Sequence, residues 1–330
     1  MKKMILLSIT MLLLAAVAFS GCLSNSEETD VVIGFQPSTH QIAYTSAKDL
    51  GWWTENLTKL DAVGNVSDRS FPTGAPEAVA LASNAIQFAY IGAAPLIPAV
   101  AQNNADLKII AAVQINGSSL IVPTNADYTG PAYFEGKSIA TFPPGSIQDT
   151  LLKTWLIDNG VDLSKVDIKA MDSADAQSAL KSGAVDAVFL PHPAPSIIEK
   201  AGDGKVIMTS GEMSADHACC VLAVSQKFID EHPEIVKEVV KIHIEATKYA
   251  NENPEAAAKA YAQITGISED IVLSSIHDWD GALVSNPHLI SDYVVAYAQA
   301  QYDQGLTNRP LTKAELFDTS FYDEYMAQNS

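Results

Sequence analysis

The sequence is poor in cysteine, in arginine and in long apolar runs, and each shortage excludes a class of protein. Three cysteines in 330 residues are too few for a disulfide framework. Its two arginines, Arg69 and Arg309, cannot form a guanidinium cluster around an anion. Lysine and arginine total 20 against 39 acidic residues, and the formal charge of −19 makes nucleic acid a poor partner. Beyond residue 22, no segment is long and apolar enough to span a membrane.

The amino terminus has the pattern of an export signal. Lys2 and Lys3 precede an apolar run over residues 5–19, and the Phe-Ser-Gly-Cys segment ending at Cys22 resembles the lipobox of bacterial and archaeal lipoproteins. This pattern predicts a signal peptide over residues 1–21 and lipidation of Cys22, which would anchor the protein to the outer face of the cytoplasmic membrane. An uncleaved membrane anchor is the alternative. Residues 22–30 are expected to form a solvated tether.

From residue 31 onward, short apolar runs alternate with amphipathic stretches of helical period. This alternation predicts an α/β protein with mostly parallel sheets flanked by helices. Strands are expected at residues 31–35, 62–70, 86–91, 107–113, 138–141, 166–170 and 187–190. Helices are expected at residues 41–50, 75–82, 95–102, 147–159 and 174–182, and then at 234–251, 255–265 and 289–304.

The repetition of this pattern in two similar modules predicts two lobes. The β-rich runs 118–122 and 219–225 bracket the second module and suit strands that cross between lobes. Lobe 1 is therefore expected to combine residues 31–120 and 222–330, and lobe 2 to cover residues 121–221. The helical carboxyl-terminal segment is expected to pack on lobe 1.

Five loops that follow expected strands are candidates for binding chemistry, because open α/β sheets bind ligands at the carboxyl ends of their strands. These loops are rich in glycine, proline and hydroxyl residues, and they cover residues 36–40, 71–74, 92–95, 142–146 and 191–193. Small residues let the backbone approach a ligand, and free amides at helix amino termini favour an anion without a basic side chain.

Several short segments, in their order and spacing, point to one family. They are Ile-Gly-Phe-Gln at residues 33–36, Ala-Lys-Asp-Leu-Gly-Trp-Trp at 47–53, Phe-Pro-Thr-Gly-Ala-Pro-Glu at 71–77, and further segments at 89–95, 135–140, 183–187 and 224–233. Over nearly all of its mature length, the chain resembles the substrate-binding proteins of ABC importers of the nitrate, sulfonate and taurine type.

The resemblance implies a two-lobed clamshell, the type 2 fold of periplasmic binding proteins. Such a protein traps a small anion, such as a sulfonate, taurine or nitrate, between its lobes and delivers it to the permease subunits. It would act as a monomer, with no cofactor and no enzymatic activity. By the same resemblance, the ligand-binding candidates are Gln36, Thr39, Gly74, Gly92 and Ala93 in lobe 1, and Gly145, Ser146 and His192 in lobe 2.

Ser146 is the strongest single candidate. It precedes an apolar helix, so its hydroxyl and the first-turn amides could bind an oxyanion. A plain helix N-cap is the alternative, and the same ambiguity applies to Thr73. His40 and His217 are further candidates because their segments are predicted to lie near the cleft.

The segment Pro191-His192-Pro193 departs from the family, in which many members have an acidic or aromatic residue at this point. A protonated histidine suits an anion, whereas a neutral one suits a metal. His40, His192 and His217 therefore raise the alternative of an exported metal-binding receptor. Cys219 and Cys220 are interpreted as core residues, because adjacent side chains of a strand point to opposite faces and could hardly bind one ion.

A second alternative is an enzyme similar to the thiamine-pyrimidine synthase of the same fold family. Cys219, Cys220 and His217 resemble its clustered cysteines and histidine faintly, but an exported, tethered chain argues against this role. No sequence motif for catalysis supports it. Trp52, Trp53 and Trp155 are expected in the core, and Trp279 is a weak contact candidate at the cleft mouth.

Overall fold

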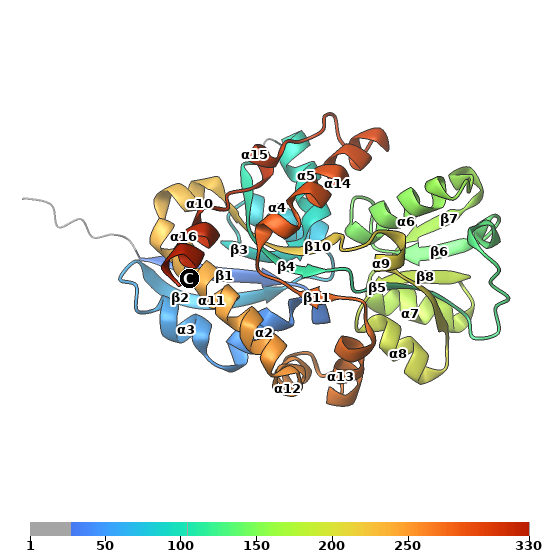
Figure 1. Ribbon diagram of the computed structural model, residues 1–330, viewed down its shortest axis with the longest axis horizontal. Helices are drawn as coiled ribbons and strands as arrows, with labels where there is room; N and C mark the ends of the chain where they lie inside the picture. The colour runs from blue at the N-terminus through green and yellow to red at the C-terminus, as the bar shows by residue number, and fades with distance from the viewer. Residues whose placement is uncertain (1–27, 104, 330) are drawn as a thin grey trace, which may run out of the picture.

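The computed structural model describes residues 28–103 and 105–329, and it contains two β-sheets that are each covered by helices (Figure 1). The α/β fold class is therefore confirmed. The expected signal peptide, the lipidation site Cys22 and most of the expected tether lie outside the described residues. Within the described ranges, no helix combines the length and the apolar character needed to cross a bilayer.

The first sheet contains six strands in the order β11-β4-β10-β3-β1-β2. β1 runs parallel to both β2 and β3, whereas β10 is antiparallel to its neighbours β3 and β4, and β11 is antiparallel to β4. The strands are β1 (Thr29–Phe35), β2 (Val63–Ser70), β3 (Phe88–Gly92), β4 (Leu107–Ile115), β10 (Ala218–Ser225) and β11 (Ala282–Leu283).

The second sheet contains five strands in the order β7-β6-β8-β5-β9. β6 runs parallel to β7 and β8, and β5 is antiparallel to β8 and β9. The strands are β5 (Ser118–Val122), β6 (Ser138–Thr141), β7 (Asp167–Ala170), β8 (Ala187–Pro191) and β9 (Lys205–Thr209). Both sheets are thus mixed, which corrects the expectation of mostly parallel sheets. The cause is that β5 and β10 enter from the other lobe and run against their neighbours.

The chain passes between the two sheets at residues 116–117 and again at residues 214–217, because β5 lies wholly in the second sheet and β10 wholly in the first. The lobe boundaries expected near residues 120 and 221 therefore fall inside these two strands. A β-rich run indicates that a strand exists but not which sheet it joins, so the sequence could locate each passage to within a few residues.

Helices cover both sheets, as Figure 1 shows, with lobe 2 mostly in green and the carboxyl-terminal helices running from yellow through orange to red. In lobe 1 they are α2 (Ile42–Asp49), α3 (Trp52–Leu57), α4 (Gly74–Ala82) and α5 (Ala93–Asn103). In lobe 2 they are α6 (Ile147–Asp158), α7 (Ser173–Ser182), α8 (Ala194–Ala201) and α9 (Ser210–Met213). The carboxyl-terminal helices are α10 (Gln226–Glu231), α11 (Pro233–Glu252), α12 (Pro254–Thr265), α13 (Glu269–Asp278), α14 (Ser291–Asp303), α15 (Lys313–Leu316) and α16 (Ser320–Gln328).

The carboxyl-terminal segment packs mainly on lobe 1, as the sequence predicts. α11 contacts α2 and α3, and α16 contacts α11 and β4. Two helices of this segment also reach lobe 2, because α13 contacts α8 and α14 contacts α6. The segment therefore joins the two lobes in addition to the two chain passages.

The core of lobe 1 is built around the central strands of its sheet, of which β3 is apolar along its whole length. Phe88, Tyr90 and Ile91 in β3 are fully buried, because helices cover one face of the sheet and further helices the other. The rings of Tyr44, Trp53 and Tyr90 pack against one another with centroid separations of 5.2–6.2 Å. This rigid layer fixes the loops that leave β1 and β3 toward the second lobe. Trp53 and Trp155 are buried, as expected, and Trp52 is partly buried.

Candidate functional site

A small hollow of about 30 Å³ lies between the two lobes, where the carboxyl ends of β1, β3, β6 and β8 face one another. Most of its lining comes from the loops and helix starts that follow these strands. The residues are Gln36, Ser38, His40, Gln41, Gly74, Gly92, Pro95, Cys219 and Cys220 from lobe 1, and Phe142, Ser146, Ile147, Gln148 and Pro191 from lobe 2. This central cavity holds no lysine, arginine or carboxylate in its lining.

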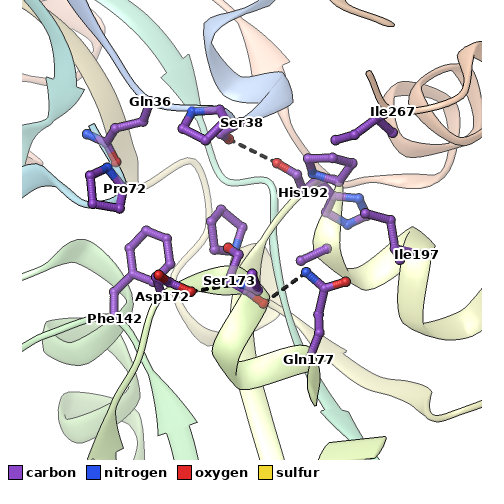
Figure 2. A pocket seen from close by; sticks show the side chains of 15 residues that line it. Gln36, Ser38, Pro72, Phe142, Asp172, Ser173, Gln177, His192, Ile197 and Ile267 are labelled. Atoms are coloured by element: carbon purple, nitrogen blue, oxygen red, sulfur yellow. Dashed lines mark hydrogen bonds between the residues drawn. The ribbon is translucent and has the colours of Figure 1, made fainter. Parts of the chain in front are cut away.

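An apolar crevice of about 240 Å³ opens beside the central cavity, and the two share Gln36, Ser38, Phe142 and Pro191. Figure 2 shows Pro72 and Phe142 on one side of the crevice and Ile197 and Ile267 on the other. Its polar lining comes from two places: Asp172, Ser173 and Gln177 at the start of helix α7, and Gln36, Ser38 and His192 from the loops after β1 and β8.

A second crevice of about 170 Å³ lies on the other side and shares Gly74, Pro95 and Ser146 with the central cavity. Thr73 and Gly145 also line it. The three hollows therefore form one continuous cleft between the lobes, with the small central cavity in the middle.

A larger hollow, of about 500 Å³, lies between lobe 2 and α13 and shares His192 with the apolar crevice. Its lining includes the exposed side chains of Glu199, Lys200 and Asp270, and Lys200 forms an ion pair with Asp270. It lacks the convergent loops of the interlobe cleft, so size alone does not identify the binding site.

Helix α4 presents its amino terminus to the cleft. Its N-cap, Thr73, makes no side-chain capping hydrogen bond, so the first-turn amides remain available to an anion. Gly74 is required here because a Cβ atom at this position would lie 2.6 Å from Cγ of Pro95. The backbone at the start of α4 can therefore approach a ligand closely.

The amino terminus of α6, on the other side of the cleft, is already occupied by the chain's own groups. The Ser146 hydroxyl accepts a hydrogen bond from the amide of Asp149 at 3.1 Å, and the Asp149 carboxylate accepts one from the amide of Gly145 at 3.1 Å. Lys153 pairs with Asp149 at 2.7 Å. Ser146 is thus an N-cap, and its hydroxyl group can still donate one hydrogen bond to a ligand.

A buried carboxyl group lies behind the cleft wall. Gln36 donates a hydrogen bond from Nε2 to Oε2 of Glu77 at 2.8 Å, while Oε1 of Glu77 has no partner in the part of the chain that the structure describes. Burial raises the pKa of Glu77 well above its ordinary value, although the Gln36 hydrogen bond opposes the shift. The shift favours the neutral acid, the form that places no negative charge beside the cleft.

The two lobes touch across the cleft through a few hydrogen bonds. Ser38 Oγ donates to the carbonyl of His192 at 2.9 Å, and the amide of Thr39 donates to the same carbonyl at 3.2 Å. Figure 2 shows the first of these bonds. Gln301 of α14 donates to the carbonyls of Ala94 in lobe 1 and Gly145 in lobe 2, at 3.2 and 3.1 Å.

His40 stands at the floor of the central cavity with the cysteine pair. Its Nε2 lies 2.6 Å from the carbonyl of Gly117, and its Nδ1 lies 3.3 Å from Sγ of Cys219 and 3.9 Å from Sγ of Cys220. The hydrogen bond between the two thiols raises the pKa of Cys219 and lowers that of Cys220 to about 5.

Cys219 and Cys220 lie in the core, as interpreted from the sequence, but the expectation that both could hardly reach one ion is wrong. Both are buried, but both line the central cavity, and their Sγ atoms and a ring nitrogen of His40 all lie within 4.8 Å of one another. The pairing register between β10 and β4 is irregular on both sides of Cys220, so the side chains do not simply alternate. Strand alternation, applied to the sequence, could not reveal this irregularity.

The other two candidate histidines do not join this group. In the described part of the chain, the one cluster of three metal-ligating residues comprises His40, Cys219 and Cys220, so the proposed His40, His192 and His217 metal site is not formed. Burial lowers the pKa of His192 to about 3 and that of His217 to about 4. Both are neutral at neutral pH, so His192 does not supply the positive charge considered above.

The structure brings most of the other candidates together. Gln36, His40, Gly74, Gly92 and Ser146 line the central cavity; Thr73, Gly145 and His192 line the adjoining crevices. Thr39 is fully buried and holds the lobes together, as described above, and its hydroxyl lies 3.1 Å from that of Ser275. Ala93 is buried in the core, and His217 bonds to Tyr297 behind the cleft. Trp279 packs against His40 and His192.

Residues 24–266 match the NMT1-like family, which is more than half of the sequence. The chain belongs to this family. Two curated relatives extend the similarity. The putative aliphatic sulfonates-binding protein of Bacillus subtilis (strain 168) is 25% identical over 336 residues, covering 100% of this chain and 98% of the relative. The taurine-binding periplasmic protein of Escherichia coli (strain K12) is 27% identical over 285 residues, covering 84% of this chain and 83% of the relative.

A solved structure shows the same fold. The alkanesulfonate-binding protein SsuA from Xanthomonas axonopodis pv. citri, bound to MOPS, superposes with a TM-score of 0.76 at 19% identity, covering 88% of this chain and 99% of that one. The two-lobed architecture is thereby confirmed, as is the resemblance to importer-binding proteins of the sulfonate and taurine type.

Proposed function

We propose that this protein is the extracytoplasmic substrate-binding component of an ABC importer and that it carries an organic sulfonate. The observation that supports this most is the composition of the cleft, in which a small polar cavity beside a free helix amino terminus continues into a longer apolar crevice. A ligand with a compact anionic head and an organic tail fits both parts. The names of the curated relatives support the same class of ligand.

The anionic head would bind in the central cavity. The first-turn amides of α4 and the Thr73 hydroxyl would donate to it from lobe 1, and the Ser146 hydroxyl from lobe 2. No basic side chain lines this cavity, so the positive end of a helix dipole and oriented donors would hold the charge. A neutral Glu77 keeps repulsion low.

The organic tail would lie in the apolar crevice, against Phe142, Ile197 and Ile267. Burying a methylene group contributes about 0.8 kcal/mol, which is about fourfold in affinity. Nitrate has no tail, so it would use none of this surface. The crevice therefore favours an organic sulfonate over nitrate as the ligand.

The ligand would also close the two lobes. Groups of both lobes would contact the same head group, so the ligand would bind the closed form better than the open form and shift the population toward it. The hydrogen bonds from Ser38 and Thr39 to the His192 carbonyl would add to closure. The permease would then recognise the closed surface.

The remaining assignments follow from the sequence. We propose that the chain is exported, lipidated at Cys22 and anchored to the outer face of the cytoplasmic membrane, and that it acts as a monomer without catalysis. Mass spectrometry of the mature protein tests the anchor, with a diacylglyceryl group on Cys22 as the expected result. An intact leader on a cytosolic protein would contradict it and would favour the enzyme alternative.

Calorimetry with a series of linear alkanesulfonates tests the proposed ligand class. The expected result is an affinity that rises about fourfold with each added methylene until the crevice is filled. Matched alkylammonium ions of the same length serve as a control for unspecific apolar binding and should not bind. Equal affinity along the series, or nitrate binding as tightly as the longest sulfonate, would refute the proposal.

Closure is tested separately by small-angle scattering. A saturating alkanesulfonate should reduce the radius of gyration of the wild-type protein. Binding in calorimetry without any change in scattering would show that the ligand sits in the cleft of a rigid molecule.

A further inference from the structure

The floor of the central cavity carries a group of donors that sulfonate binding does not use. His40 Nδ1 and the thiols of Cys219 and Cys220 all lie within 4.8 Å of one another, and all three residues are buried. Among the described residues the two thiols are free, and they come from the irregular part of β10, while His40 comes from the short helix η1 (Thr39–Gln41). Two observations, the spacing of the donor atoms and the orientation of the His40 ring, indicate a metal-binding site.

The spacing of the donors is close to that in a tetrahedral metal site. With metal–sulfur and metal–nitrogen bonds of about 2.3 and 2.05 Å, tetrahedral angles put the sulfur and nitrogen donors about 3.6 Å apart. The observed distances from Nδ1 to the two Sγ atoms are 3.3 and 3.9 Å, on either side of this value. Small side-chain shifts would therefore place a cation between the three atoms.

The hydrogen bonding of His40 fixes which ring nitrogen faces the thiols. The Gly117 carbonyl can only accept, so Nε2 must carry the proton that it donates across 2.6 Å. Nδ1 then has a free lone pair directed toward both sulfur atoms. A metal-bound histidine commonly donates its other N–H to a backbone carbonyl in this way, which orients the ring and makes it a better ligand.

The backbone around His40 leaves the ring little freedom. A Cβ atom on Gly117 would lie 2.9 Å from Nε2 of His40 and 3.0 Å from the Trp279 ring, so glycine is needed for the close approach of the carbonyl. Trp279 packs on the ring of His40 with a centroid separation of 5.6 Å. The ring is therefore held in its orientation by neighbours from three separate segments.

We propose that His40, Cys219 and Cys220 form a binding site for a thiophilic cation of the d¹⁰ class, such as Zn²⁺ or Cu⁺. Soft thiolate donors with one imidazole select such ions over Mg²⁺ or Ca²⁺. Zn²⁺ binds both sulfur atoms as thiolates, so any proton that the pair still carries passes to solvent when the metal binds. The three protein ligands leave a fourth position, and all three residues line the central cavity, so that position is open to a small ligand there.

This site extends the proposed function without depending on it. A sulfonate can bind in the cleft whether or not the metal binds, and the metal can bind in a protein whose organic ligand is something else. The experiments on the two are therefore separate, and failure of one leaves the other intact.

Titration with Co²⁺, a spectroscopic substitute for Zn²⁺, tests the site on the full chain under reducing, anaerobic conditions. The expected result is one Co²⁺ per chain with sulfur-to-cobalt charge-transfer bands in the near ultraviolet, which Zn²⁺ then abolishes by displacement. Cys219→Ser and Cys220→Ser should each weaken these bands, and the double variant should lack them. His40→Gln should lower the affinity for Zn²⁺ at least tenfold.

His288→Gln is the matched control, because His288 is an exposed histidine that bonds to Asp323 and does not belong to the His40 cluster. It should bind Co²⁺ like the wild type. Absence of the bands in the reduced wild-type protein would overturn the proposal, as would bands that persist in the double cysteine variant.

A second measurement guards against variants that fail to fold. In the wild-type protein, two fewer thiols should react with an alkylating reagent when Zn²⁺ is present than when it is absent. Equal reactivity with and without Zn²⁺, in a protein that binds no Co²⁺, would also overturn the site.

Discussion

Gln301→Ala is a direct test of how the lobes are held closed. Gln301 is fully buried in α14 and donates from one Nε2 to the carbonyls of Ala94 in lobe 1 and Gly145 in lobe 2. The bond to Ala94 joins two parts of lobe 1, so we expect it to persist when the lobes separate. The bond to Gly145 joins α14 to lobe 2, so we expect it to be lost then. The substitution therefore removes one interaction from folding and another from closure.

The two effects have different sizes. A hydrogen bond contributes about 1 kcal/mol net, so loss of the Gly145 bond should weaken ligand affinity by about fivefold. Loss of both bonds and of the side chain's packing should lower the free energy of unfolding by about 2–4 kcal/mol. Calorimetry with an alkanesulfonate measures the first effect, and urea denaturation measures the second.

Gln299→Ala is the matched control, because Gln299 lies on the exposed side of the same helix and bonds only to Asp303 among the described residues. It should change neither the affinity nor the unfolding free energy by a comparable amount. If Gln301→Ala lowers stability but leaves the affinity unchanged, Gln301 is a structural residue and the reasoning about closure is refuted.

Three further outcomes are expected. Burial raises the pKa of Glu77, so the folded protein keeps a proton that the unfolded chain loses above pH 4.5. The free energy of unfolding should therefore fall by about 1.4 kcal/mol per pH unit between pH 4.5 and the pKa of the folded state. Glu77→Gln should remove this slope in urea denaturation, and an unchanged slope would contradict the prediction. Burial lowers the pKa of three histidines, to about 3 for His192 and about 4 for His217 and His243. The free energy of unfolding should therefore decrease as the pH falls below 6.5, by about 2 kcal/mol for each histidine at pH 5. Equal stability at pH 7 and pH 5 would refute this. Gly74→Ala should abolish sulfonate binding, because its Cβ would meet Pro95 and shift the start of α4, and normal calorimetry would contradict it.

Strands such as β3 and β8 could be predicted because they are apolar over their whole length. β6 begins and ends where the sequence places it, and β4 extends two residues beyond the expected end, to Ile115. The sequence does not predict β9, because Lys205–Thr209 show no alternation of apolar and polar residues. In the structure all five residues are half-buried. Such a strand is fixed by its pairing with β5, which is not visible in the local sequence.

Helix α8 could not be predicted from the sequence because of the prolines at its start. The run Pro191-His192-Pro193-Ala194-Pro195 is typical of a loop, yet proline is well tolerated in the first turn of a helix because no intrahelical bond is lost there. The helix therefore begins at Ala194, directly after a loop that lines the cleft.

The candidate site was predictable to the extent that strand ends determine it. The loops after β1, β3, β6 and β8 meet because the fold class brings the carboxyl ends of parallel strands together. The environment of His40 was not predictable, because its Nε2 partner, Gly117, is 77 residues away, and the cysteines are 179 and 180 residues away. The neutral state of His192 likewise depends on burial by both lobes.

A crystal structure of the protein with a long-chain alkanesulfonate is the most direct test of the binding mode. The expected result is a sulfonate group between Gly74 and Ser146, with its alkyl chain along Phe142 and Ile197. A sulfonate bound on the outer surface of either lobe, with the interlobe hollow left to water, would contradict the account.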